Sequence, residues 1–280
     1  MTPDPTPTGL LPLPGQTILS LRGADRLRFL NGQVTNDVRS VSGAACVQAA
    51  VLDAKGRLEA VCHIREIHDA YLVDAPPCLR ELLPARLDRY LIADEVEIAD
   101  LTGTWHLAHV LGTEAPGIPG VFSFPVDRFG VPGIDLLSPA AFRPDLPELD
   151  PVEIEGLRIR HGIPLWPHEL HPGIFPAEAG LDRTAVSFDK GCYLGQEVVS
   201  RMKRAGRTNQ HLVLLAVPSG TMVGTPLLHD GKEAGGITSV SPVAESDGLH
   251  LAIAYRRRQQ EHVTTFKLPS GTAKVHRQLS

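Results

Sequence analysis

A cysteine at position 192 stands among residues that favour thiol chemistry. The surrounding stretch, residues 190–197, reads Lys-Gly-Cys-Tyr-Leu-Gly-Gln-Glu, and cations follow it at Arg201, Lys203, Arg204 and Arg207. Apolar positions recur at helical spacing after the second glycine, so a glycine-rich turn is predicted to open a short helix. Cations and the positive end of a helix dipole both lower the pKa of a thiol. The stretch therefore makes Cys192 a candidate reactive thiol, with Lys190 and Arg201 as the cations that would support the negative charge of its thiolate.

Two interpretations of Cys192 stay open on the residues alone. Free cysteine is among the most buried residue types, so Cys192 fits a small core residue beside a tight turn. A reactive thiol instead needs an exposed, electropositive setting, which the flanking cations would supply. In that second case Gln196 and Glu197 would orient the turn or a bound ligand.

Hydrophobic spacing predicts the elements that position this stretch. Strands are predicted at 16–22, 45–52, 58–64, 70–74, 95–98 and 105–111, with shorter apolar pieces at 121–126 and 134–137. Helices are predicted at 26–31 after an Asp25 N-cap, from Pro77 to Leu91 with a break at Pro84, at 150–161, and from 195 to 206. Asp53-Ala54-Lys55-Gly56 predicts a hairpin. Strands and helices interleave without strict alternation, which is typical of an α+β fold.

The last part of the chain has a different pattern. Short strands are predicted at 211–217, 225–228, 236–240, 249–255 and 262–268, separated by turn signals. Such a pattern is typical of a small antiparallel barrel. The predicted organisation is a flexible N-terminal arm at 1–15, an α+β region of two interleaved subdomains at 16–207, and a β-barrel domain at 208–280.

The composition is that of a soluble globular protein. Hydrophobic residues make up 42% of the chain, yet no segment approaches the roughly 18 consecutive apolar residues of a membrane helix. The N-terminal stretch lacks the basic region of a signal peptide, so we expect a cytoplasmic protein. The net charge of −5 gives no strong case for binding nucleic acid.

The cysteines and histidines do not predict a metal centre. Cys46, Cys62, Cys78 and Cys192 are far apart, which argues against a disulfide framework and against clustered thiolate ligands. The first three are predicted to be core residues. In His168-Glu169-Leu170-His171, Pro172 occupies the place where a metalloprotease motif needs its second histidine. We therefore expect no metal site.

The motif at 190–197 is matched by a known signature. It resembles the Lys-Gly-Cys-Tyr-x-Gly-Gln-Glu sequence of the YgfZ folate-binding family at every fixed position. That family is related to the T-protein, the aminomethyltransferase of the glycine cleavage system. The resemblance extends to the block Phe-Leu-Asn-Gly-Gln-Val-Thr-Asn-Asp at 29–37, to the hairpin at 53–57, to Gly162-Ile163-Pro164 and to the barrel. It covers nearly the whole chain.

The resemblance implies a fold, a ligand and a role. The family fold is a ring of α+β subdomains closed by a β-barrel, around a cavity that holds tetrahydrofolate in related proteins. Family members are linked to assembly or maintenance of iron–sulfur clusters in particular enzymes, including tRNA-modifying ones. Carried over by position, the functional thiol is Cys192 beside Lys190, and the folate-binding candidates are Glu59, Arg160, Tyr193, Gly195, Gln196, Glu197 and Arg201. The implied partners are a folate derivative and iron–sulfur client or assembly proteins.

Two positions depart from the T-protein pattern. Arg160 replaces the glutamate that anchors the pterin ring. A carboxylate accepts hydrogen bonds from a pterin amide edge whereas arginine only donates, so Arg160 weakens the expectation of folate binding. It would instead lie near the glutamate tail of a folate or pair with a local carboxylate. Glu59 offers one carboxylate where the T-protein has an Asp-Asp pair, so aminomethyl transfer is not favoured.

Three functional hypotheses remain. The leading one is a folate-binding accessory protein for the assembly, maintenance or repair of iron–sulfur enzymes, which acts through Cys192. The alternative is a folate-dependent one-carbon transferase of the aminomethyltransferase type, which needs Glu59. The third is a binding module without chemistry, in which Cys192 is inert. Whether the chain is an enzyme is left open among them.

Overall fold

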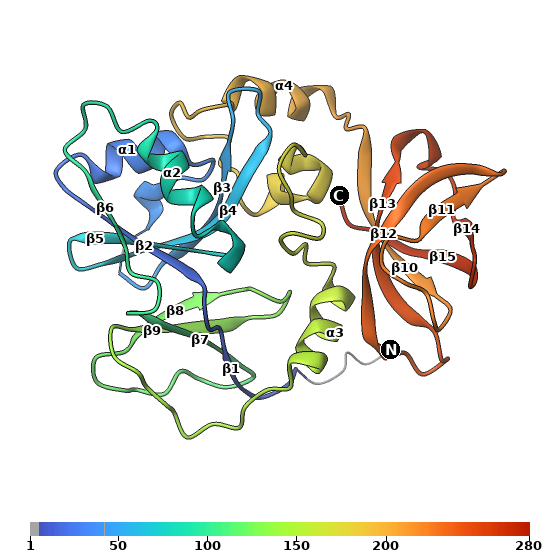
Figure 1. Ribbon diagram of the computed structural model, residues 1–280, viewed down its shortest axis with the longest axis horizontal. Coiled ribbons are helices and arrows are strands. Elements are labelled where there is room, and N and C mark those ends of the chain that lie inside the picture. The colour runs from blue at the N-terminus through green and yellow to red at the C-terminus, as the bar shows by residue number, and fades with distance from the viewer. Residues whose placement is uncertain (1–5, 42) are drawn as a thin grey trace. The chain divides into compact units, whose positions relative to one another are not determined.

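The computed structural model describes residues 6–41 and 43–280, which form two compact units (Figure 1). One unit comprises the described residues up to Leu149 together with Thr184–Glu197, and the other comprises Asp150–Arg183 with Val198–Ser280. Each unit is thus assembled from separate stretches of the chain. The predicted domain ranges, 16–207 and 208–280, divide the chain at a different place. In the structure, residues 150–183 group with the barrel and not with the residues before them. The predicted ranges stay predictions.

The first unit contains a five-stranded antiparallel sheet with the order β3-β4-β5-β2-β6. Its strands are β2 (Thr17–Arg22), β3 (Cys46–Leu52), β4 (Leu58–Ile67), β5 (Ala70–Ala75) and β6 (Glu97–Asp100). The predicted hairpin joins β3 to β4, and its turn is closed by Asp53. The Asp53 carboxylate accepts hydrogen bonds from the backbone N–H groups of Lys55 and Arg57, both at 2.8 Å. These strands and the hairpin confirm the sequence prediction.

A second, four-stranded antiparallel sheet of this unit has the order β1-β7-β9-β8. Its strands are β1 (Gly9–Pro12), β7 (His106–Leu111), β8 (Phe122–Val126) and β9 (Gly133–Ser138). β1 lies inside the segment predicted to be a flexible arm, so that prediction is wrong for these residues. Leu10 and Leu11 are buried in a strand that pairs with β7. The prolines of the segment indicate a flexible chain and give no sign of this distant partner. Residues 1–5 of the predicted arm lie outside the described residues.

The two sheets of this unit share an apolar core. Its members are Ile18, Ile67 and Leu72 from the first sheet and Leu107, Phe124 and Leu137 from the second. Each buried aliphatic or aromatic side chain contributes about 1.5–3 kcal/mol relative to an exposed one. The core therefore fixes how the two sheets lie against each other.

A buried charge network crosses between the same two sheets. Arg65 of β4 donates hydrogen bonds to Asp74 of β5 at 2.5 Å and to Asp135 of β9 at 3.0 Å. Arg128 donates to both carboxylates, and His109 Nδ1 lies 2.8 Å from Asp135. Burial opposes ionisation of Asp135, but the Arg128 cation and the His109 hydrogen bond lower the pKa of this carboxyl overall. The network adds directional contacts to a core that is otherwise apolar.

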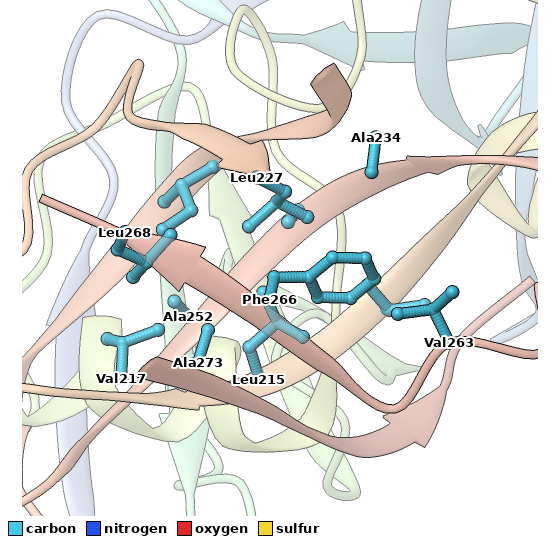
Figure 2. Packing of buried hydrophobic residues seen from close by; sticks show 12 residues of the cluster. Leu215, Val217, Leu227, Ala234, Ala252, Val263, Phe266, Leu268 and Ala273 are labelled. Carbon is cyan, nitrogen blue, oxygen red and sulfur yellow. The ribbon is translucent and has the colours of Figure 1, made fainter. Parts of the chain in front are cut away.

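The second unit contains a closed antiparallel barrel with the order β10-β13-β12-β11-β14-β15. Its strands are β10 (Gln210–Val217), β11 (Pro226–His229), β12 (Lys232–Ala244), β13 (His250–Arg257), β14 (Thr265–Leu268) and β15 (Gly271–Gln278). Figure 2 shows the apolar interior, which includes Leu215, Leu227 and Phe266. The predicted barrel and α+β class are confirmed. β15 was missed because most of its residues are exposed and polar.

The α-helices of the described chain are α1 (Arg26–Gln33), α2 (Leu82–Asp88), α3 (Pro151–His161) and α4 (Gln196–Ala205). The predicted helix from Pro77 to Leu91 is interrupted, but not at Pro84: a 3₁₀ turn at Pro77–Leu79 precedes α2, and Pro84 lies in the first turn of α2, where proline is tolerated. No helix of the described residues is both long and apolar enough to cross a membrane.

Helix α3 shows both of its predicted boundaries. The Asp150 carboxylate accepts a hydrogen bond from the Val152 N–H at 2.8 Å, and Gly162 ends the helix in the left-handed conformation with φ 71°. Within the second unit α3 packs on β12, where a β-carbon at Gly156 would lie 3.2 Å from Val243. This packing explains why the helix groups with the barrel.

Candidate functional site

Residues 185–195, here called the signature loop, contact two other segments of the first unit. One is the segment 31–37, which covers the end of α1 and the following turn. The other is the hairpin turn 53–57. The contacts join residues as far apart in sequence as Lys190 and Asn31, which are separated by 159 positions. The three segments that carried the family resemblance in this unit thus form one structure.

Lys190 is the buried anchor of the signature loop. Only 5% of the residue is exposed. Its Nζ donates hydrogen bonds to the carbonyl oxygens of Asn31 at 2.7 Å, Val34 at 2.8 Å and Asn36 at 2.7 Å. An ammonium has three N–H donors, so each donor has an acceptor. Burial lowers the pKa of the Lys190 amine to about 8.

The anchor works because α1 ends at this place. The last carbonyls of a helix lack partners inside the helix, and a cation near them is also favoured by the helix dipole. Lys190 satisfies the carbonyl of Asn31, and the backbone N–H of Leu194 donates to the carbonyl of Gly32 at 3.2 Å. The signature loop therefore caps the C-terminus of α1 with one charge and one amide.

Thr35 provides a second connection between the segment 31–37 and the signature loop. The side chain is fully buried and donates from Oγ1 to the carbonyl of Ala185 at 2.5 Å. The same oxygen accepts a hydrogen bond from the Ala50 N–H at 2.8 Å, and the Thr35 carbonyl accepts one from the Ser187 N–H at 3.0 Å. Thr35 thus links the segment 31–37 both to the signature loop and to β3.

Gly195 lets the signature loop approach the hairpin closely. Its φ of +84° lies in the left-handed region that favours glycine. A β-carbon at this position would lie 2.7 Å from the carbonyl oxygen of Asp53 and 3.0 Å from the Cα of Gly56. Both atoms belong to the backbone and cannot move aside cheaply. Gly195 thus permits a close approach of the signature loop to the hairpin turn that no other residue type would allow.

Cys192 is exposed at the surface of this loop. Of the two interpretations that the sequence left open, the buried core residue is therefore wrong. Cys46 and Cys62 are partly and fully buried, as predicted, but Cys78 is exposed and is not the core residue that its apolar neighbours suggested. Cys78 precedes α2 in the 3₁₀ turn that Pro77 opens.

The structure shows how three neighbours of Cys192 are placed. Lys190 was expected to support the thiolate, but its three donors bind carbonyl oxygens, so its role is to hold the loop. Gln196 Nε2 lies 3.4 Å from the Gly191 carbonyl and helps to close the turn, in line with the prediction. Glu197 is exposed in the first turn of α4, where a carboxylate is favoured by the helix dipole.

Tyr193 is the other buried member of the motif. The residue is 8% exposed, its ring lies 5.3 Å from Lys190 Nζ, and burial raises the pKa of its hydroxyl to about 12. Within the described part of the chain the hydroxyl has no hydrogen-bond partner. Tyr193 thus packs over the Lys190 ammonium, and it remains a predicted folate contact.

Glu59 is in the same unit but is engaged elsewhere. Its carboxylate pairs with Arg86, which is 5% exposed. Arg86 also donates to Gln33 Oε1 at 3.1 Å and to the Leu52 carbonyl at 2.8 Å, and its guanidinium lies 4.2 Å from the Tyr90 ring centre. Arg86 was not singled out from the sequence, because its partner Glu59 is 27 positions away and nothing in the residue type indicates which carboxylate it binds.

Arg160 and Arg201 belong to the second unit. Arg160 donates a hydrogen bond to Glu245 Oε1 at 2.8 Å, so the predicted pairing with a local carboxylate is confirmed. Arg201 is exposed on α4. The structure thus brings Lys190, Cys192, Tyr193, Gly195 and Gln196 together in the first unit, whereas the two arginines are described with the second.

The histidine-flanked Glu169 is also explained within the second unit. It is fully buried and accepts hydrogen bonds from Ser239 Oγ at 2.6 Å and from the Leu165 N–H at 3.0 Å. Arg158 lies 3.3 Å from the same carboxylate. The residues that the structure describes contain no group of three or more His, Cys, Asp or Glu side chains placed to hold a metal ion.

Comparison with solved structures defines the fold class. The chain is similar to the glycine cleavage system aminomethyltransferase T from Bartonella henselae, with a TM-score of 0.82 over 96% of this chain and 85% of that one. The two sequences are 15% identical, so the likeness concerns the fold. The predicted aminomethyltransferase-like fold is confirmed.

Comparison with curated sequences gives the relatives. The chain is 27% identical over 240 residues to a protein named tRNA-modifying protein YgfZ from Sodalis glossinidius, covering 75% of this chain and 72% of the relative. It is 24% identical over 246 residues to an iron–sulfur cluster assembly factor IBA57 homolog from Phaeosphaeria nodorum, covering 76% of this chain and 56% of the relative. No protein family model matches the sequence. The chain is a relative of the YgfZ and IBA57 proteins, which confirms the resemblance seen in its motifs.

We expect Gly195→Ala to destabilise the protein and to displace the signature loop. The left-handed conformation costs a non-glycine residue about 1–2 kcal/mol, and the contact with the Asp53 carbonyl adds to that. Urea unfolding measures the change, and Cys192 alkylation reports the displacement of the loop.

Gly191→Ala is the matched control, because a β-carbon at Gly191 meets nothing within 4 Å. The control should leave the free energy of unfolding nearly unchanged. Equal stability of the two variants would show that the hairpin contact of Gly195 does not constrain the loop.

Proposed function

We propose that this protein is a folate-binding accessory factor for iron–sulfur enzymes that acts through Cys192 in the cytoplasm. The relatives support the general role by name, since one is called a tRNA-modifying protein and another an iron–sulfur cluster assembly factor. The motif that contains Cys192 supports the specific role. Its partners would be iron–sulfur client or assembly proteins.

One observation carries the proposal: an exposed thiol lies on a loop that a buried ammonium fixes in place. Burying a lysine is costly unless its donors are satisfied, and here three carbonyls satisfy them. A loop that served only as a connection would need no such anchor. The arrangement suits a thiol that must be presented to another protein in a defined position.

An exposed thiolate offers two kinds of chemistry to an iron–sulfur client. It can donate an electron pair to iron as a cluster ligand. It can also attack a disulfide of the partner, so that a new S–S bond forms to Cys192 while the partner's bond breaks and its second sulfur leaves as a thiolate. Either reaction needs the sulfur to be accessible, which the exposure of Cys192 satisfies.

The carried-over residues do not fit the pterin contact of the T-protein pattern. Arg160 donates to Glu245 and offers no acceptor to a pterin ring. The single carboxylate of Glu59 is paired with Arg86. We therefore propose tetrahydrofolate as the ligand on the family resemblance alone, and assign no step of the function to it. For the same reason the aminomethyltransferase alternative has only the fold in its favour.

Replacement of Cys192 tests the proposed role directly. We expect Cys192→Ala to lose the ability to restore the activity of iron–sulfur enzymes, including a tRNA-modifying one, in cells that lack the native protein. Cys78→Ala is the matched control, because Cys78 is also a free, exposed cysteine. It should restore activity as well as the unaltered chain does. Full activity with Cys192→Ala would refute a role for this thiol.

Calorimetric titration with tetrahydrofolate tests the ligand. We expect the native protein to bind tetrahydrofolate saturably, through side chains other than that of Arg160. The Arg160→Glu variant restores the carboxylate of the T-protein pattern and removes the cation that pairs with Glu245. If only this variant bound tetrahydrofolate, the native chain would have kept the fold without the cofactor.

A further inference from the structure

Helix α4 and the residues just after it carry a row of exposed arginines. Arg201 and Arg204 lie one turn apart on the helix, and Arg207 follows directly after its C-terminal glycine, Gly206. All three arginines are exposed. They are called here the α4 basic face. The helix begins four residues after Cys192 in the chain.

The opposite side of α4 is apolar, so the helix has a fixed orientation. Val199 is 5% exposed, and Val198 and Met202 are partly buried. Burial of these side chains holds the apolar side inward. The arginines lie on the exposed side of the helix.

The three arginines of the α4 basic face differ from several other exposed arginines, which have ion-pair partners. Arg28 pairs with Asp94 at 2.6 Å, and Arg257 pairs with Glu233 at 2.8 Å. Within the described part of the chain, no carboxylate lies within ion-pair distance of the three arginines of α4. Like charges one turn apart destabilise a helix by about 0.2–0.5 kcal/mol per pair. Repulsion between the arginines thus destabilises the helix slightly, and no ion pair within the described chain offsets it.

Interaction with the helix dipole explains only part of this row. Cations are favoured in the last turn of a helix, which accounts for Arg204. Arg201 lies in the middle of α4, and Arg207 lies beyond its end. The dipole effect falls off within one turn, so these two positions need another reason.

We propose that the α4 basic face binds an acidic segment of a protein partner. The guanidinium group forms paired hydrogen bonds with carboxylates, and three of them in seven residues suit a short run of Asp or Glu side chains. This inference rests on the proposed function, because the protein that carries the acidic segment would be the iron–sulfur client or assembly partner.

Two features favour an acidic protein over a nucleic acid. The residues of α4 and Arg207 include no aromatic side chain, so the face offers no platform for stacking bases. The whole chain also has a net charge of −5, so a long polyanion that extended beyond the face would meet an acidic protein. A short acidic segment would contact the arginines alone.

Fluorescence anisotropy with two labelled probes of equal length tests the proposal. The probes are an oligoaspartate peptide and an oligouridylate, titrated with the full chain at low and at physiological salt. We expect the peptide to bind, with an affinity that falls as salt rises. The variant Arg201→Gln/Arg204→Gln/Arg207→Gln should bind it about tenfold more weakly or worse.

The control variant removes the same number of cations from other places. Arg89, Lys232 and Lys274 are exposed and, in the described chain, also lie outside ion-pair distance of any carboxylate. The triple variant Arg89→Gln/Lys232→Gln/Lys274→Gln should bind the peptide nearly as well as the unaltered chain. An equal loss in both variants would mean that the peptide responds to overall charge, and would overturn the proposal.

Two other results would also overturn it. Tighter binding of the oligouridylate through the same three arginines would make the face a nucleic-acid surface. Absence of peptide binding at low salt would show that the face has no affinity for acidic segments. The Cys192→Ala variant should bind the peptide normally, so failure of the thiol role and failure of this surface would be seen separately.

Discussion

The contact between the Lys190 ammonium and three backbone carbonyls is the constraint on which the rest of the site depends. The acceptors belong to Asn31, Val34 and Asn36, at the end of α1 and in the turn after it. A helix end leaves carbonyls that must find partners, and a buried ammonium needs acceptors, so each requirement is met by the other. Because the contact fixes the residue two positions before Cys192, it also fixes the place where the thiol emerges.

The rest of the first unit supports this contact by rigid packing. Two sheets share an apolar core and the network of Arg65, Arg128, Asp74 and Asp135. The hairpin between β3 and β4 extends from one of these sheets, and Gly195 packs against its turn. The signature loop is therefore held on one side by a charge and on the other by a backbone contact that excludes a side chain.

Much of the fold could be predicted because its signals are local. The hairpin at 53–57 and the Asp150 N-cap of α3 each follow from residues close in sequence. Asp25 shows where such a signal misleads, because its carboxylate accepts from the Glu95 N–H, 70 positions away, and does not cap α1. β1 was missed for the same physical reason, since its order depends on pairing with β7.

The candidate site could be located from sequence, but its internal roles could not. The position of Cys192 followed from the motif, but the residues left open whether its thiol is buried or exposed, and the structure shows that it is exposed. The partners of Lys190 are backbone carbonyls, which no residue type reveals, so its role was assigned wrongly to the thiolate. Arg160 was correctly given a local carboxylate as one alternative, but its choice of Glu245 depends on how α3 and the barrel pack.

The rate of Cys192 alkylation in native protein, compared between the unaltered chain and Lys190→Met, tests the central claim most directly. Methionine keeps much of the side-chain volume but donates no hydrogen bond to the three carbonyls. If Lys190 holds the loop, the alkylation rate of Cys192 should change severalfold while that of Cys78, measured in the same sample, stays constant. Unchanged rates at both cysteines would show that the loop keeps its position without the ammonium, and would contradict the account.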